Sequence, residues 1–358
     1  MINITGQILD SSGYAIHTRE LAKALSKITD VRLSSKVPDN ATTLLSDKEV
    51  QLLKKGGEKN DINLIITNPL YWRTYADQNR NWVYLVWEGD KLPLSYFNEC
   101  LNPAIEYIIV PSEHTKKALE ETCQMHLFHS ADEVLDKVRV IPHGVDLDKF
   151  YPKDKKEDVF TFIANKGLRN LEDRGGIQYL LQAFNEEFTK DDKVRLLIKI
   201  NPVYGIPNMD DIMKQLEIDP KNCPDIKVTA DNIPHEKLID LYSEGDVFVS
   251  PTRAEAFNLP CLEAMACGLP VITTNFGGQT DYVTQENGWL VGGDLTEIKH
   301  ELQYEGIAWI TPDIKGLQEA LRYVFKNKDL VKEKGCKALE TAKNLTWDNT
   351  SKLIKELI

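Results

Sequence analysis

VFVSPTRAEAFNLPCLEAMACGLPVITTNFGG, residues 247–278, is the most informative stretch of this chain. It begins with a short apolar run, 247–249, which predicts a buried strand. A polar turn follows, and a helix is expected to start near Asn258, an N-cap candidate, with Pro260 in its first turn. A second apolar run, 271–274, predicts another buried strand. Strand, helix and strand in this order indicate a parallel α/β unit.

Two carboxylates stand out within this stretch, Glu255 in the turn and Glu263 in the helix, in the pattern E-x7-E. The junction of turn and helix offers backbone N–H groups and the positive end of a helix dipole, which suit a diphosphate. A carboxylate accepts hydrogen bonds from pairs of hydroxyl groups, as sugars present them. These features predict a pocket for a sugar nucleotide. The alternative is an ordinary pair of surface glutamates beside a buried αβ unit.

The segment EAFNLPCLEAMACGLPVI resembles the signature of glycosyltransferase family 4, E-G-F-G-x-P-x-x-E-A-M-A-x-G-x-P-V-I, whose members are retaining enzymes of the GT-B fold. The resemblance implies that Glu255 contacts the donor sugar and that Glu263 contacts the ribose. It also implies that three residues line the sugar–diphosphate region through their backbones: Phe257, Asn258 and Leu259. Ala256 and Asn258 depart from the pattern, because glycine is common at both positions in the family.

Length and charge limit the classes of function. A chain of 358 residues predicts two domains of ordinary size. The formal net charge of −12 argues against nucleic acid as the main partner, since phosphate backbones select basic surfaces. A local basic patch could still meet an anionic lipid surface, so peripheral membrane contact stays open.

The cysteines and the N-terminal sequence favour a cytoplasmic protein. The 6 cysteines show no C-x-x-C spacing and are expected to be reduced, buried thiols. The start, MINITGQIL, lacks the features of a signal peptide, and no apolar run approaches the length of a membrane span.

The first half alternates short apolar runs with helical or polar segments, which predicts a parallel sheet covered by helices. Residues 2–5 predict its first strand, followed by a glycine turn and a helix, although the G-x-G-x-x-G fingerprint of a dehydrogenase is absent. By resemblance, Gly13 in this turn approaches the donor diphosphate; the alternative is a plain strand-to-helix turn. The polar segment 46–61 is expected to be a loop.

The stretch WVYLVWEGDKLP, residues 82–93, places Glu88 and Asp90 just after a buried strand. Ligands bind at the carboxyl edge of such sheets. Some family 4 enzymes carry a similar W-E-x-x-x-L-P stretch, which implies that this side of the cleft meets the acceptor. Glu88 would then orient an acceptor hydroxyl or assist its deprotonation. A strand-capping carboxylate is the alternative for Glu88.

VRVIPHGVDLDKFYP, residues 138–152, resembles the family's I-P-x-G-V-D-x-x-x-F-x-P, which ends the first domain. His143 would lie at the cleft floor, where it touches the donor or holds the turn; the turn is favoured. Asp146 and Asp148 form a D-x-D pair by letter, a pattern that holds a metal in other glycosyltransferases. In this setting the pair is interpreted as structural, and no metal is expected.

The segment NKGLRNLEDRGGIQYLLQAF, residues 165–184, resembles the family stretch in which two cations clamp the diphosphate. Arg174 matches one cation, and either Lys166 or Arg169 is the other. Such a pair neutralises the charge of the departing nucleoside diphosphate, which a metal would otherwise do. Further along, Gly277 and Gly278 either contact the donor or form a tight turn.

Together, the resemblance implies the GT-B fold: Rossmann-like α/β domains at 1–152 (acceptor side) and 153–343 (donor side) face a central cleft, and 344–358 cross back to the first domain. It implies transfer of a hexose from a UDP- or GDP-sugar to a hydroxyl of a glycan, lipid-linked or other acceptor, with retention and without a cofactor. The catalytic candidates are Glu255, Arg174 and Glu88. A GT-B sugar-nucleotide epimerase and a non-catalytic sugar-nucleotide-binding subunit remain as alternatives.

Overall fold

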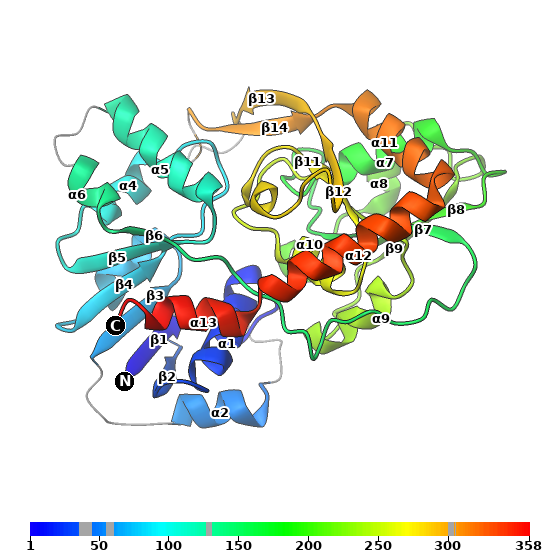
Figure 1. Cartoon of the computed structure of the whole chain (residues 1–358). Coiled ribbons are helices and arrows are strands. Elements are labelled where there is room, and N and C mark those ends of the chain that lie inside the picture. Colours follow the sequence, from blue (N-terminus) through cyan, green and yellow to red (C-terminus); the bar gives the residue numbers. More distant parts are fainter. Residues whose placement is uncertain (36–44, 55–60, 127–130, 300–303, 305) are drawn as a thin grey trace. The chain divides into compact units, whose positions relative to one another are not determined.

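A computed structural model gives the fold and describes residues 1–35, 45–54, 61–126, 131–299, 304 and 306–358. The chain divides into two compact units, each built on its own parallel sheet (Figure 1). The first unit comprises Met1–Gly144, Glu297–Ala308 and Leu345–Ile358, and the second comprises Val145–Thr296 and Trp309–Asn344. The sequence places a domain boundary at 152, whereas the packing changes from one unit to the other after Gly144.

The first unit contains a six-stranded parallel sheet in the order β2-β1-β3-β4-β5-β6. Its strands are β1 (Ile2–Gly6), β2 (Val31–Ser34), β3 (Ile62–Ile66), β4 (Arg80–Tyr84), β5 (Ile105–Val110) and β6 (Val138–Val140). Every residue of β1 and β3 is buried, as expected of strands covered on both faces. The strand order reverses between β1 and β3, since the chain builds outward from β1 first in one direction and then in the other.

Helices surround this first sheet. They are α1 (Gly13–Leu25), α2 (Asp47–Lys54), η1 (Pro69–Tyr71), α3 (Trp72–Tyr75), α4 (Leu94–Cys100), α5 (Glu113–His126), α6 (Ala131–Leu135) and α13 (Trp347–Lys355). The C-terminal helix α13 packs against α1, so the end of the chain returns to the first unit. The expectation of a loop over 46–61 is wrong for the part that α2 occupies, and 55–60 lie outside the described residues.

The second unit repeats the arrangement with the order β12-β11-β10-β7-β8-β9. Its strands are β7 (Phe160–Lys166), β8 (Val194–Ile200), β9 (Asp225–Thr229), β10 (Val247–Ser250), β11 (Val271–Thr274) and β12 (Gly288–Val291). The bounds of β11 are those predicted from the sequence. Here the order reverses between β7 and β10. A small two-stranded sheet pairs β13 (Gly293–Glu297) with β14 (Ala308–Pro312).

The helices of the second unit alternate with its strands, and the last two of them follow its last strand. They are α7 (Ile177–Glu187), η2 (Pro202–Tyr204), α8 (Met209–Gln215), η3 (His235–Lys237), α9 (Leu238–Tyr242), α10 (Leu259–Ala266), η4 (Gly278–Asp281), α11 (Ile314–Lys326) and α12 (Lys328–Asn344). Nowhere in the described ranges is a helix both long and apolar enough to span a bilayer.

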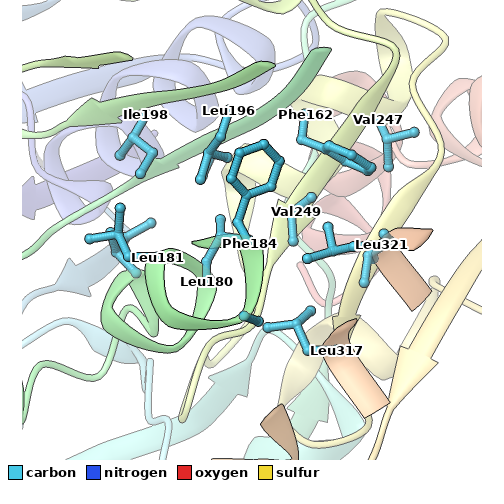
Figure 2. Packing of buried hydrophobic residues seen from close by; sticks show 14 of the residues in the cluster. Phe162, Leu180, Leu181, Phe184, Leu196, Ile198, Val247, Val249, Leu317 and Leu321 are labelled. Atoms are coloured by element: carbon cyan, nitrogen blue, oxygen red, sulfur yellow. The ribbon is translucent and has the colours of Figure 1, made fainter. Parts of the chain in front are cut away.

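The core of the second unit lies between its sheet and helices α7 and α11 (Figure 2). Phe162, Leu196 and Val249 point from the strands toward Phe184 of α7 and Leu321 of α11. All five side chains are fully buried. Truncation of such an aromatic to alanine typically costs about 3–5 kcal/mol, so this core fixes the strands whose ends carry the candidate site.

Candidate functional site

The candidate site of the second unit lies where the strand order reverses. Strand β7 ends at Lys166 and its neighbour β10 ends at Ser250. The connections that follow β7 and β10 leave in opposite directions, and the carboxyl ends of strands at such a reversal are where open α/β sheets generally bind ligands. Two loops, residues 167–176 and 251–258, continue from these ends and carry most of the predicted donor residues.

Four predicted residues form one group of charges and hydrogen bonds, here called the Lys166 cluster: Lys166, Arg174, Glu255 and Asn258. Lys166 Nζ donates to Glu255 Oε1 at 2.7 Å and to Asn258 Oδ1 at 2.6 Å. Arg174 Nη1 lies 3.9 Å from Glu255 Oε2. Two cations and one carboxylate leave an excess positive charge, and the Lys166 side chain is only 4% exposed. The cluster therefore suits an anionic group.

The cations also fix the ionisation of Glu255. Burial alone would raise the pKa of this carboxyl, but the charges of Lys166 and Arg174 and the hydrogen bond from Lys166 outweigh it, and the pKa lies below its ordinary value. Glu255 is therefore a carboxylate at neutral pH, able to accept hydrogen bonds but not to act as an acid.

Of the two candidates for the second cation, the structure brings Lys166 to Arg174 and Glu255. Arg169 instead has its Nε 3.5 Å from Asp173 Oδ2, and its side chain is 58% exposed. Asp173 Oδ2 also accepts from the Arg169 backbone N–H at 3.1 Å. The geometry thus favours Lys166 as the partner of Arg174.

Asn258 occupies the N-cap position of α10, as predicted, but its side chain makes no capping hydrogen bond. Its amide is used elsewhere: Oδ1 accepts from Lys166, and Nδ2 donates to Ser250 Oγ at 3.0 Å. Its backbone is left-handed, with φ +73°. Asparagine tolerates this conformation better than most residues, which explains how it stands where the family pattern has glycine.

The two loops are joined by backbone contacts that position Arg174. Its carbonyl accepts from the Arg253 N–H at 2.8 Å and from Thr252 Oγ1 at 3.0 Å. Arg174 Nη1 donates in return to the Ala254 carbonyl at 3.2 Å. At Gly176, φ is +79° and a Cβ would lie 1.8 Å from the Pro251 carbonyl oxygen, so only glycine lets the loops approach this closely.

Arg253 is a buried part of this junction that sequence reasoning missed. It is 3% exposed, donates from Nη1 to the Glu172 carbonyl at 3.2 Å, and lies over the Trp309 ring at 5.5 Å. A lone arginine after a strand is typical of a solvated surface, and no spacing in the sequence distinguishes a buried arginine from a solvated one. Through this hydrogen bond to Glu172, Arg253 helps to hold the loop that carries Arg174.

Gly277 and Gly278 contact the backbone of Glu255. The Gly278 N–H donates to the Glu255 carbonyl at 2.8 Å, and a Cβ at Gly277 would lie 2.9 Å from the same oxygen. The Tyr282 hydroxyl, just beyond, lies 2.7 Å from the Phe257 carbonyl oxygen and 2.8 Å from that of Asn258. The backbone of residues 255–258, just before Leu259 at the start of α10, is thus held by residues 278–282.

Glu263 lies in α10 and is bonded on both oxygens. The His235 ring Nε2 is 2.7 Å from Oε1, and the Tyr242 hydroxyl donates to Oε2 at 2.8 Å. Tyr242 in turn accepts from Asn165 Nδ2 at 3.2 Å. An ionised carboxylate has about four acceptor positions, so two remain for hydroxyl groups of a ligand. Neither His235 nor Tyr242 was among the sequence candidates.

Part of the chain matches a known family. Residues 160–304, which hold every member of the Lys166 cluster, match the model of the family described as glycosyl transferases group 1. This part of the chain is a group 1 glycosyl transferase domain.

Curated relatives and solved structures extend the likeness. A D-inositol 3-phosphate glycosyltransferase of Rhodococcus jostii is 25% identical over 246 residues, 65% of this chain and 49% of that protein. A probable sucrose-phosphate synthase of Thermosipho melanesiensis is 27% identical over 44% of this chain and 36% of its own length. The chain thus spans about half of the length, or less, of these relatives.

Two solved structures show the same fold over nearly the whole chain. Sucrose-phosphate synthase of Thermosynechococcus elongatus has a TM-score of 0.69 at 18% identity, with 99% of this chain and 97% of that one covered. HepE of Anabaena, solved with UDP-glucose, has a TM-score of 0.67 at 14% identity, with coverage of 99% and 98%. The architecture is therefore GT-B: two Rossmann-like α/β domains.

Outside the group 1 domain, the first unit carries the remaining candidates. Gly13 is exposed at the start of α1, where Ser12 Oγ accepts from the Ala15 N–H at 3.2 Å. The Glu88 carbonyl is 3.0 Å from His114 Nε2, which donates to it. Asp90 Oδ1 accepts from the Ala308 N–H at 2.7 Å. Asp90 thus links Ala308 to the loop that carries Glu88.

His143 is buried in the first unit and belongs to an aromatic group. Its ring lies 4.1 Å from that of His17 and 5.8 Å from that of Trp347, centroid to centroid. Burial lowers the pKa of His143 to about 3, and burial and the nearby His143 lower that of His17. This packing favours the structural role of His143 over contact with a ligand. Across the described residues, no three His, Cys, Asp or Glu side chains gather in a way that could hold a metal ion.

Proposed function

We propose that this chain is a retaining glycosyltransferase that moves a hexose from a nucleoside diphosphate sugar to a hydroxyl acceptor. The observation that carries the proposal is the Lys166 cluster, an excess of positive charge at the strand reversal of the second unit, beside a carboxylate. HepE, solved with UDP-glucose, supports a UDP-linked donor, and a GDP-linked donor is the alternative. The acceptor is proposed to be a glycan, lipid-linked or other hydroxyl compound of polysaccharide or glycoconjugate synthesis in the cytoplasm.

The cluster suggests how the donor bond is broken. As the bond between sugar and diphosphate lengthens, negative charge grows on the departing diphosphate, and Lys166 and Arg174 are placed to stabilise it. Because Lys166 is buried, its interaction is weakly screened by water. The two cations supply the neutralisation that a divalent metal supplies in other enzymes, so we propose that transfer needs no metal.

Glu255 has two tasks in this proposal. It holds the two cations in place before the donor arrives, and its carboxylate accepts hydrogen bonds from the hydroxyls of the donor sugar. Its negative charge also favours the positive charge that develops on the sugar ring as the leaving group departs. Glu88, in the first unit, is proposed to orient the acceptor hydroxyl.

Substitution within the cluster tests the proposal. Glu255→Gln and Arg174→Met should each lower the transfer rate by about 100-fold, since each removes a charge that acts on the transition state. Transfer is measured as release of nucleoside diphosphate and formation of glycosylated product, with and without EDTA. Arg169→Met is the matched control, because it removes an exposed cation that pairs outside the cluster.

The outcomes of these experiments distinguish the proposed transfer, its independence of metal and the epimerase alternative. Near-normal transfer in both cluster variants, with folded protein by circular dichroism, would contradict the assignment. Loss of transfer on adding EDTA would contradict the metal-independent mechanism alone. A donor whose sugar changes without any acceptor would identify an epimerase.

A further inference from the structure

Lys199 is a buried cation that the proposed mechanism leaves unused. It is the penultimate residue of β8 and is 4% exposed. Its side chain makes neither a hydrogen bond nor an ion pair with any residue that the structure describes. Burial lowers the pKa of its amine, an effect that the charge of Glu263 opposes.

The strand register shows which groups Lys199 faces. Its Cα is in register with Asn165 of β7 and with Thr229 of β9. Side chains in register on neighbouring parallel strands point to the same face of the sheet. On that face, Asn165 donates to the Tyr242 hydroxyl, and Tyr242 donates to Glu263. Lys199 therefore points toward the carboxylate that, by resemblance, binds ribose.

Lys199 and Glu263 are neighbours but not partners. The charge of Glu263 acts on Lys199, yet no ion pair joins the two residues. One carboxylate oxygen is bonded by His235 and the other by Tyr242. The ammonium thus keeps its N–H donors for another acceptor beside Glu263.

The order of strands indicates which part of a donor reaches Lys199. Across the sheet, β10, β7, β8 and β9 are neighbours in that order. Glu255 follows β10, Lys166 ends β7, and Lys199 lies on β8, one strand further from β10. A nucleoside diphosphate sugar that puts its diphosphate at the Lys166 cluster and extends toward β9 would place its nucleoside at Lys199.

We propose that Lys199 binds the nucleoside of the donor by a hydrogen bond from its ammonium to an oxygen of the ribose or of the base. The inference rests on the proposed function, since it requires a nucleotide donor in the second unit. It assigns to Lys199 the recognition of the nucleoside, and to Lys166 and Arg174 that of the diphosphate. In this proposal, the Lys199 ammonium gains its hydrogen-bond acceptor only when the donor is bound.

Calorimetric titration of ligand-free protein with UDP, GDP and pyrophosphate tests this division. Lys199→Met, which keeps the length of the side chain and removes the charge, should weaken binding of the preferred nucleoside diphosphate by about 10- to 100-fold, the usual effect of losing a charged hydrogen bond. Its affinity for pyrophosphate should stay within about threefold of wild type. Lys227→Met is the matched control, because Lys227 is an exposed lysine on the adjacent strand β9 and should bind as wild type does.

Thermal unfolding of the ligand-free variants distinguishes a binding role from a structural one. Lys199→Met should have a melting temperature equal to or above that of wild type, because burial already disfavours the charged form of the Lys199 amine. Deoxyribose analogues of the preferred nucleotide separate the two nucleoside contacts. If Lys199 binds a ribose hydroxyl, removing that hydroxyl should weaken binding to wild type more than to Lys199→Met, in which only the contact with Glu263 is left to lose. Equal weakening in both proteins assigns Lys199 to the base.

Three results would overturn the inference. Wild-type affinity of Lys199→Met for the nucleotide would reject it and leave the proposed function standing. Equal loss of nucleotide and pyrophosphate, or a melting temperature well below wild type, would identify a general electrostatic or structural lysine. If wild-type protein binds neither nucleotide at millimolar concentration, the proposed function fails and the role of Lys199 fails with it.

Discussion

The neutral side chain of Asn258 leaves the Lys166 cluster with its excess positive charge. Its Oδ1 lies 2.6 Å from Lys166 Nζ, and its Nδ2 donates to Ser250. The carboxylate of Asp would have almost the same shape. It would add a second negative charge beside Lys166 and cancel the excess positive charge of the cluster.

We therefore expect Asn258→Asp to weaken nucleoside diphosphate binding by about tenfold or more, because a charge this close to a bound anion acts through partly buried space. Asn258→Gly is the control: it keeps the left-handed backbone and leaves the cluster charge unchanged. Titration calorimetry at fixed ionic strength measures both affinities. Equal affinities for the two variants would show that the ligand does not sense the charge at this position.

Loops 167–176 and 251–258 act as one element because their backbones are bonded to each other. The contact is closest at Gly176, whose φ is +79° and whose missing Cβ leaves room for the Pro251 carbonyl. Any side chain there separates the loop that carries Arg174 from the loop that carries Glu255. The geometry of the Lys166 cluster depends on this approach.

Gly176→Ala should lower the free energy of unfolding by about 2 kcal/mol or more, combining left-handed backbone strain of about 1–2 kcal/mol with the steric clash. It should also lower transfer, since Arg174 and Glu255 move apart. Gly13→Ala is the matched substitution: no atom lies within 4 Å of the added methyl group, and alanine favours the first turn of α1. Urea unfolding monitored by tryptophan fluorescence compares the two. An unchanged midpoint in Gly176→Ala would refute the close approach.

The elements that sequence analysis predicts correctly are those whose local pattern agrees with their burial. Strand β11 begins with the apolar pair Val271 and Ile272 and continues with two β-branched threonines, and its bounds are those predicted. Helix α2 was missed because its sequence, DKEVQLLK, is polar. Glu49 of α2 lies 3.5 Å from both Arg19 and Lys23 of α1, a tertiary pairing that no local pattern reveals.

Among the site residues, the signature gave Glu255 and Glu263, and the structure brings Lys166, Arg174 and Asn258 to Glu255. Arg253, His235 and Lys199 were not found, because a single cation or histidine outside a motif has the same appearance whether it is buried or solvated. Strand register and burial, which become known only with the fold, separate the two cases.

The whole molecule is acidic, with a formal net charge of −12. In contrast, the candidate donor-binding residues include two neighbouring cations, Lys166 and Arg174, beside Glu255. An acidic surface repels an anionic donor at long range, and salt screens this repulsion over about 10 Å. Binding then depends on short-range contacts with buried cations such as Lys166, which salt affects little. This arrangement favours specific recognition over general attraction of anions.

At the same scale, the stability of the first unit should depend on pH through two buried histidines. His17 of α1 and His143 after β6 pack against each other and against Trp347 of α13. The pKa of His143 falls to about 3 in the fold and that of His17 also lies well below its usual value, so both rings are neutral at pH 7. The unfolded chain protonates them near pH 6.5, which means that stability is full above this pH and declines as the pH falls below it.

From pH 7 to pH 5, His143 alone should reduce the free energy of unfolding by about 2 kcal/mol, since the slope approaches 1.4 kcal/mol per pH unit once the unfolded form is protonated. His143→Gln removes this titration, and its stability should fall less steeply over the same range. The remaining slope then comes from His17 and His114, whose pKa burial also lowers, and toward pH 5 from carboxyls with a lowered pKa such as Glu255. Urea unfolding at half-unit pH steps, followed by tryptophan fluorescence, gives both slopes. Parallel slopes for wild type and His143→Gln would mean that His143 takes up a proton in the folded state as readily as in the unfolded chain, and the packing of Trp347 against it would then be too loose to exclude water.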